Sequence, residues 1–334
     1  ATYACLSHCW GKTGAALQLR KTTFESLKHG VAVEKLPKTF REAMKICKEL
    51  GIRFIWIDAL CIMQDDAEDW QEAATSMANI YQNSIITIAA TWSSDSNGGC
   101  FTSIKEPLQA RKLGNTGLYV RVSLPDFSNY DFGTEHESEN WPLLGRGWVL
   151  QERILSTRVV HYAKHQLFWE CNTSFLSQDG LQDLEANDKY FYSKVGKTPA
   201  IPLKMSLADP TLSWRKIVCT YTGLQLTKTS DLLPALAGIV EQEMRRRKDD
   251  TYVAGMWKST LLDDLAFYTE EGPRTGSTAP TWSWLSSKGR VYFTTFQKLP
   301  SLELVNLNFT SIGPVSLGQV SNASIIVRGP VLLV

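Results

Sequence analysis

The opening part of the chain alternates between apolar runs typical of strands and amphipathic stretches typical of helices. This alternation favours an α/β fold, because strand–helix–strand order with short connections builds a parallel sheet with helices on both faces. The expected sheet is doubly wound, and its strands, buried on both faces, carry continuous apolar side chains. The predicted strands are residues 3–7, 54–57 and 84–90, and the predicted helices are 39–50 and 69–82.

Two domains are expected in this chain of 334 residues. Residues 1–92 form the α/β lobe, and residues 93–334 form an α+β extension packed on it, rich in C-terminal strands. The predicted elements of the extension are a loop over 93–99, a polar exposed segment over 130–142, a hairpin over 158–163 and 166–171, helices over 212–221 and 231–247, and strands over 282–284, 291–293, 302–307 and 325–334.

Composition excludes several classes of protein. A net charge of +1 argues against a nucleic-acid binder, because no basic face dominates a balanced surface. The seven cysteines are odd in number and irregularly spaced, which favours reduced thiols in the cytoplasm over a disulfide framework. No apolar run has the length of a membrane span, and no signal-peptide pattern opens the chain. Because the chain enters a strand almost at Ala1, an upstream segment is expected.

Polar side chains follow two of the predicted parallel strands. Ser7 and His8 end the first strand, and Asp58 ends the second. In doubly wound sheets, ligands bind beyond the carboxyl ends of the strands. These residues are therefore candidates for a binding or catalytic site, although an Asp at this position also commonly caps a helix.

Three motifs occur in order along the chain: LSHCWG at residues 6–11, a long pattern from WIDALC at 56–61 through DW at 69–70 to IY at 80–81, and RGWVLQER at 146–153. Together they resemble the fungal heterokaryon-incompatibility (HET) family, and AGMW at 254–257 and PTWSW at 280–284 resemble its extended region. The resemblance implies an effector of programmed cell death in non-self recognition. It also implies a homo-oligomer on activation, an upstream sensor, and no membrane partner.

The HET family is in turn distantly similar to Toll/interleukin-receptor (TIR) domains, so the resemblance implies a TIR-like, flavodoxin-like parallel sheet. Many TIR domains cleave NAD with a Glu on the helix after a central strand. Family members read Asp-Trp-x-x-Glu, with Met four residues beyond the Glu. Here Met77 sets the register, so Ala73 occupies the Glu position. Glu72 lies one residue early, and one helical step of about 100° prevents a simple replacement. Either the protein lacks this carboxylate naturally, or it carries an inactivating Glu→Ala change, which we favour because a disabled toxic effector is easier to express.

NAD is therefore the expected substrate, and no prosthetic group or metal is expected. Cleavage of the nicotinamide–ribose bond passes through an oxocarbenium-like state that a carboxylate stabilises. The candidate catalytic positions are Ala73, Glu72, Asp58 and Ser7. The site also needs an aromatic face for the nicotinamide and donors for the pyrophosphate. The candidate nucleotide-binding residues are His8, Trp10, Gly11, Trp70, Arg146, Trp148, Glu152 and Arg153.

Simpler readings remain open for these residues. In these interpretations the Trp side chains belong to the hydrophobic core, and the two Arg side chains bind the acidic loop Asp65-Asp66. His8 is then a loop histidine whose hydrogen bonds are satisfied within the protein. A Cys61–His8 nucleophile pair would make a different hydrolase, but Cys61 lies in an apolar run and buried thiols are usually inert. A non-catalytic module that kills by self-association or by recruiting a partner is the alternative of another functional class.

Overall fold

The structure is a computed structural model that describes residues 1–103, 108–122, 124, 141–180, 184–185, 210–269, 271–272, 279–294 and 301–330. It contains two compact units, Ala1–Met205 and Ser206–Val334. The first unit thus extends well beyond the boundary near residue 92 that the sequence suggested. The reason is that later strands join the same sheet. The predicted polar segment 130–140 and the end of the last predicted strand, 331–334, lie outside the described residues.

Three parallel strands form the first part of the sheet in unit 1. They are β1 (Tyr3–Ser7), β2 (Phe54–Ile57) and β3 (Ile86–Ala89), and β1 lies between the other two. Both pairings of β1 are parallel, with Leu6 opposite Ile57 on one side and opposite Ile88 on the other. The predicted parallel arrangement of these segments is confirmed.

Helices cover both faces of this sheet. Side chains of β1 alternate between the faces, and Ala4 and Leu6 pack with Phe40 and Ala43 of α2 (Lys38–Glu49) in one apolar core. On the other face, the thiol of Cys5 contacts the carbonyl oxygen of Ile80 in α4 (Ala67–Asn83). Both helices were predicted, and α4 begins two residues early because the Asp66 side chain accepts hydrogen bonds from the first backbone N–H groups.

Strand β2 is not buried on both faces, as its apolar sequence suggested. It is the edge strand of the sheet, and Phe54 at its start is 52% exposed. Only β1 and β3 have the buried character expected of central strands. An apolar run therefore identified the strand but not its place in the sheet.

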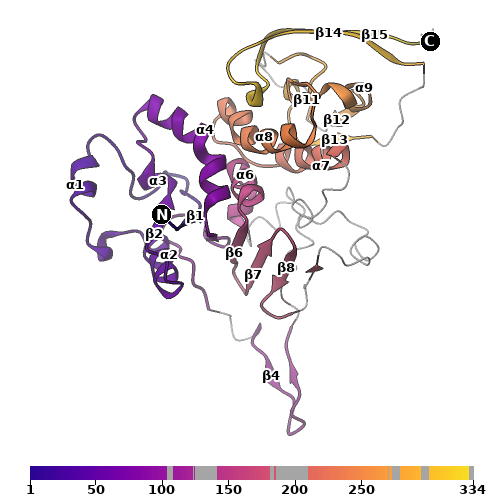
Figure 1. The fold of residues 1–334 in the computed structure, drawn as a ribbon. Coiled ribbons are helices and arrows are strands. Elements are labelled where there is room, and N and C mark those ends of the chain that lie inside the picture. The colour runs from indigo at the N-terminus through magenta and orange to yellow at the C-terminus, as the bar shows by residue number, and fades with distance from the viewer. Residues whose placement is uncertain are drawn as a thin grey trace. The chain divides into compact units, whose positions relative to one another are not determined.

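The sheet continues past β3 through strands far along the chain. Strand β6 (Arg158–Tyr162) pairs with β3 in parallel, and β7 (Leu167–Cys171) pairs with β6 as the predicted antiparallel hairpin. Strands β8 (Ser174–Ser177) and β9 (Leu184–Glu185) complete the mixed seven-stranded order β2-β1-β3-β6-β7-β8-β9. Figure 1 shows β6, β7 and β8 side by side. The sheet is thus α/β in its first part and antiparallel in its second.

Short elements complete unit 1. The motif RGWVLQER forms α6 (Gly147–Leu155), which leads directly into β6. The others are α1 (Phe24–Lys28), η1 (Val33–Lys35), α3 (Asp58–Cys61), β4 (Arg111–Lys112), β5 (Tyr119–Val120) and η3 (Pro142–Gly145).

Unit 2 contains helices α7 (Pro210–Thr222) and α8 (Ala237–Arg246), and the first was predicted within two residues at its start. The second was predicted from residue 231, but Pro234 lacks a backbone N–H, and the segment before Ala237 forms two 3-10 turns, η5 (Thr229–Leu232) and η6 (Pro234–Leu236). The remaining elements are β10 (Tyr252–Val253), β11 (Met256–Trp257), η7 (Lys258–Thr260), α9 (Leu261–Asp264), β12 (Phe267–Thr269), η8 (Trp284–Ser286), β13 (Val291–Phe293), β14 (Glu303–Ser311), η9 (Val315–Leu317) and β15 (Val320–Arg328).

A glycine turn organises the core of unit 2. Gly255 has a φ of +80°, and its carbonyl oxygen accepts hydrogen bonds from the indole N–H groups of Trp214 and Trp284. Residues 282–284, predicted as a strand, instead form a turn, because the Ser283 hydroxyl accepts from the N–H of Leu285 at the start of η8. The AGMW and PTWSW motifs therefore meet at this turn for a structural reason.

All seven cysteines are free thiols. Among the described residues, no helix is long and apolar enough to span a membrane.

Candidate functional site

Residues from all three motifs meet at the carboxyl ends of β1 and β2. Strand β1 ends at Ser7, β2 ends immediately before Asp58, and α4 and α6 pack over the same face of the sheet. We call this group the strand-end cluster, and it consists of Ser7, His8, Trp10, Asp58, Tyr81, Arg146 and Glu152.

Glu152 lies at the centre of the cluster and is only 5% exposed. The Ser7 hydroxyl donates a hydrogen bond to Glu152 Oε2 at 2.5 Å, and the Tyr81 hydroxyl, which donates to the carbonyl oxygen of Leu6, lies beside this carboxyl group. Burial raises the pKa of Glu152 to about 7, with a further contribution from the negative charge of Asp58. The two hydroxyls and Arg146 act in the opposite direction. Glu152 therefore changes charge near neutral pH.

Asp58 is the more accessible carboxylate of the cluster, with 19% of its side chain exposed. Its Oδ2 accepts a hydrogen bond from the indole N–H of Trp10 at 2.8 Å, and its Oδ1 accepts from the backbone N–H of Ala59 at 2.7 Å. The second contact satisfies one N–H of the first turn of α3, but Asp58 is the first helical residue and not the cap, because the cap position is Ile57. Asp58 thus contacts both the backbone of α3 and the Trp10 side chain in the loop after β1.

His8 is buried, and neither ring nitrogen has a hydrogen-bond partner. Its Nδ1 lies 3.7 Å from Asp58 Oδ1, and its ring meets Phe40 edge-on. Burial lowers the pKa of His8 to about 4, because removal from water disfavours the charged ring more than the nearby Asp58 favours it. The imidazole is therefore neutral at pH 7. Buried polar groups normally have hydrogen-bond partners, but neither ring nitrogen of His8 has one among the described residues. The interpretation of His8 as a loop histidine with satisfied hydrogen bonds is therefore not supported.

Arg146 connects the start of α6 to the loop after β1. Its guanidinium donates to the backbone carbonyl of His8 and lies near the thiol of Cys9, whose pKa burial raises and the Arg146 charge lowers. A guanidinium carries five N–H donors, more than these two contacts use. Arg146 thus places positive charge beside the cluster.

Position 73 faces the same side of α4 as the cluster. At about 100° per residue, Trp70, Ala73, Met77 and Tyr81 fall within about 80° of one another on the helix, whereas Glu72 lies about 200° from Trp70. Met77 and Tyr81 are buried and Glu72 is exposed. Trp70 meets Trp148 of α6 edge-on at 6.3 Å. Ala73 therefore lies between Trp70, which contacts Trp148, and Tyr81 on the same side of α4, and Glu72 points elsewhere.

Arg153 belongs to a different network from Glu152, although the two are consecutive in sequence. Arg153 Nε donates to Glu170 Oε2 at 2.6 Å, and His161 Nε2 lies 3.1 Å from the same oxygen. Successive helix residues point about 100° apart, so α6 presents Glu152 to the strand-end cluster and Arg153 to β6 and β7. The motif alone gave no sign of this separation. Glu170 lies in the predicted hairpin, where it had no assigned role in the site.

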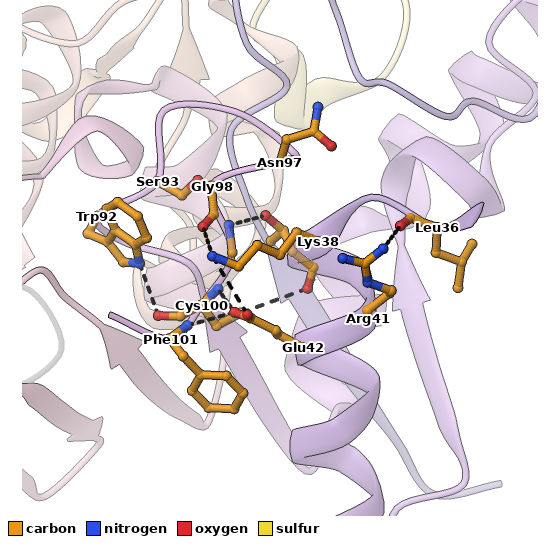
Figure 2. A network of polar contacts seen from close by, with 12 residues as sticks. Leu36, Lys38, Arg41, Glu42, Trp92, Ser93, Asn97, Gly98, Cys100 and Phe101 are labelled. Carbon is orange, nitrogen blue, oxygen red and sulfur yellow. Dashed lines mark hydrogen bonds and ion pairs between the residues drawn. The ribbon is translucent and has the colours of Figure 1, made fainter. Parts of the chain in front are cut away.

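Gly11 is held against the loop after β3. Its φ is +84°, and a Cβ there would lie 2.9 Å from the Cβ of Asp95. Figure 2 shows how this second loop is fixed to α2: Glu42 Oε2 accepts from the backbone N–H groups of Cys100 and Phe101, and Lys38 donates to the Gly98 carbonyl. Gly11 therefore has a packing role that accounts for its presence in the first motif.

The acidic loop has partners of its own. Asp65 accepts hydrogen bonds from the backbone N–H of Lys21, and Asp66 pairs with the Lys21 ammonium group at 3.2 Å while capping α4. Cys61, expected to be buried in its apolar run, is exposed at the end of α3. The argument from burial against a Cys61–His8 nucleophile pair therefore fails. In the strand-end cluster, the acidic side chain near His8 is that of Asp58.

Comparison with known proteins agrees with the motifs. No curated protein and no solved structure matches the chain. Residues 3–152 match the family model described as heterokaryon incompatibility protein (HET), and every member of the strand-end cluster lies within this match. Residues 3–152 of this chain therefore form a heterokaryon-incompatibility (HET) domain.

Proposed function

We propose that this chain is a cell-death effector of heterokaryon incompatibility that hydrolyses NAD at the nicotinamide–ribose bond. The HET domain implies the role in incompatibility. The observation that carries the chemical proposal is the meeting of two carboxyl groups, a neutral buried imidazole and a guanidinium at the carboxyl ends of β1 and β2. The parallel order β2-β1-β3 with helices on both faces supports a TIR-like arrangement, in which ligands bind at this edge.

In the proposed reaction, the bond between ribose C1′ and the nicotinamide nitrogen breaks, and its electron pair neutralises the pyridinium. The oxocarbenium-like ribose then takes up water, which loses a proton, so that ADP-ribose, nicotinamide and H⁺ are formed. Asp58 stabilises the developing positive charge, since it is the more exposed carboxylate of the cluster. Neutral His8 accepts a hydrogen bond from the attacking water or a ribose hydroxyl, because its ring nitrogens have no hydrogen-bond partner in the protein.

Binding of the remaining parts of NAD follows from the neighbouring side chains. Arg146 has donors for the pyrophosphate, and Trp10 or the Trp70–Trp148 pair offers an aromatic face to nicotinamide. Ser7 and His8 are each 2% exposed, so NAD reaches them only when the residues that cover them move. Arg153 is left out of this proposal because it is engaged with Glu170.

The test is nicotinamide release from NAD by this chain and by its Ala73→Glu variant. A carboxylate at position 73 would lie on the α4 face shared with Met77 and Tyr81, so we expect the chain itself to bind NAD but turn it over slowly, and the variant to gain about a hundredfold or more. Asp58→Asn in the Ala73→Glu background should remove the gain. Glu72→Gln in that background should not, since Glu72 is exposed on another face. Absence of NAD binding by both forms would refute the proposal.

A second function is favoured by one surface observation. Leu118, Tyr119, Val120 and Val122, in and around strand β5, are all exposed. Such a concentration of apolar side chains suits self-association or a partner protein. In this reading the chain kills without consuming NAD. Toxicity of the Ala73 form in cells with undiminished NAD would favour it, and so would loss of toxicity when Tyr119 and Val120 are replaced by Ser.

A further inference from the structure

The Ser7–Glu152 hydrogen bond determines what kind of ligand group the end of β1 recognises. A serine hydroxyl has one proton to donate and two lone pairs that accept. Here the proton is directed to Glu152 Oε2 at 2.5 Å. While this bond persists, Ser7 Oγ offers only acceptor capacity to any third group. A ligand group placed beside it must therefore be a donor, such as a hydroxyl.

We infer that Glu152 is a positioning residue that orients the Ser7 hydroxyl so that Ser7 Oγ accepts a hydrogen bond from a ribose hydroxyl of the nucleotide. This inference rests on the proposed function and specifies how one part of that substrate is bound. Ser7 makes the contact, and Glu152 acts through it. The places of the two residues in the fold agree with this division: Ser7 ends β1, where ligands of such sheets bind, and Glu152 lies on α6.

The protonation state of Glu152 controls this orientation. An ionised Glu152 accepts from Ser7, whereas a protonated Glu152 has a proton that it can donate to Ser7 Oγ. Donation to Ser7 would turn the Ser7 proton toward the ligand and abolish its fit to a hydroxyl donor. Because burial places the pKa of Glu152 at about 7, the two forms exchange near neutral pH. Ribose binding should therefore strengthen as pH rises through this range.

Other titratable groups face Glu152 from each neighbouring element. Tyr81 of α4 and the Cys5 and Cys9 thiols beside β1 have raised pKa values because of burial, so they stay neutral in this pH range. The charged neighbours are Asp58 of α3, which raises the pKa of Glu152, and Arg146, which lowers it. His8, with a pKa of about 4, remains neutral as well. Glu152 is thus the group in this set expected to change charge near pH 7.

The experiment measures binding of ADP-ribose, which the proposed reaction does not consume, by titration calorimetry between pH 5.5 and 8.5. The intact chain should bind ADP-ribose about three- to tenfold more tightly at high pH, because one additional hydrogen bond changes affinity by about this factor. Glu152→Gln and Ser7→Ala should each flatten this dependence, and the double variant should behave like either single variant. Tyr81→Phe should keep the dependence but move its midpoint upward, because Tyr81 stabilises the ionised carboxylate. Glu49→Gln, at an exposed residue of α2, is the control and should match the intact chain.

The outcomes separate the inference from the function on which it rests. Binding that is independent of pH, or that retains its pH dependence in Glu152→Gln, would overturn the positioning role while leaving NAD as the ligand. No binding of either ADP-ribose or NAD at any pH would overturn both. A carboxyl carbon resonance of Glu152 in the ligand-free protein supplies a second readout. Titration near pH 7 supports the inference, and titration near its ordinary pKa of 4.5 would contradict it.

Discussion

Arg153 Nε donates to Glu170 Oε2 at 2.6 Å, and both side chains are buried, at 4% and 3% exposure. This pair joins α6 to β7, and His161 of β6 lies against the same carboxylate oxygen. It fixes the helix that carries Glu152 to the part of the sheet that follows β3. The strand-end cluster therefore depends on a second buried network that the substrate need not touch.

Replacement of Arg153 by Met should destabilise unit 1 strongly. Removal of one member of a buried ion pair leaves an uncompensated charge and typically costs about 3–5 kcal/mol. Urea unfolding should show this loss, whereas Arg158→Met, at an exposed neighbour, should change stability by less than about 0.5 kcal/mol. A stable Arg153→Met protein that no longer binds ADP-ribose would instead assign Arg153 to the nucleotide, as the motif had suggested.

Glu152 should make the protein less stable as pH rises. The folded chain holds a proton on Glu152 up to about pH 7, whereas the ordinary pKa is 4.5, so the unfolded chain releases it first. Stability is therefore lost between pH 4.5 and pH 7 and stays low above that range, by roughly 2–4 kcal/mol. Glu152→Gln should remove this contribution and leave the opposite trend that His8 produces. Unfolding free energies at pH 5 and pH 8 test the prediction, and equal slopes in both proteins would contradict it.

His8 should have the opposite effect. Its pKa is lowered from 6.5 to about 4, so the unfolded chain binds a proton in this interval and the folded chain does not. Stability is then lost as pH falls from 6.5 to 4, by about 3 kcal/mol in total. Because Glu152 opposes this trend over part of the interval, the comparison belongs in the Glu152→Gln background. There, adding His8→Asn should reduce the acid sensitivity, and unchanged acid sensitivity would show that His8 is solvated.

Gly255→Ala tests the core of unit 2. Gly255 has a φ of +80°, and an added Cβ would lie 2.8 Å from the Trp284 ring, so we expect a loss of about 2–4 kcal/mol. The matched control is Gly272→Ala, where φ is +79° and nothing lies within 4 Å of the added atom. It should cost only the backbone term, about 1 kcal/mol. Thermal unfolding followed by Trp fluorescence measures both, and equal losses would exclude a steric role for Trp284.

The sequence alone determined most of the local structure. Apolar spacing located β1, β2, α2, α4 and the β6–β7 hairpin, because strands and helices place apolar residues at different periods. The errors of the sequence-based predictions concerned the place of a segment within the fold. Phe54 is exposed because β2 is an edge strand, and Trp284 begins a 3-10 turn because its indole bonds to a carbonyl in a distant glycine turn.

The family and the residues of interest also followed from the sequence, since the motifs containing Ser7, Asp58 and Arg146 are contiguous stretches. Only the tertiary structure decided how those residues act together. Glu152 and Arg153 are neighbours in one motif, yet the helix directs one to Ser7 and the other to Glu170. The raised pKa of Glu152 and the lowered pKa of His8 are likewise products of burial and of charges brought near by folding. A linear sequence specifies side-chain types, whereas desolvation and long-range contact, which set their chemistry, exist only in the folded chain.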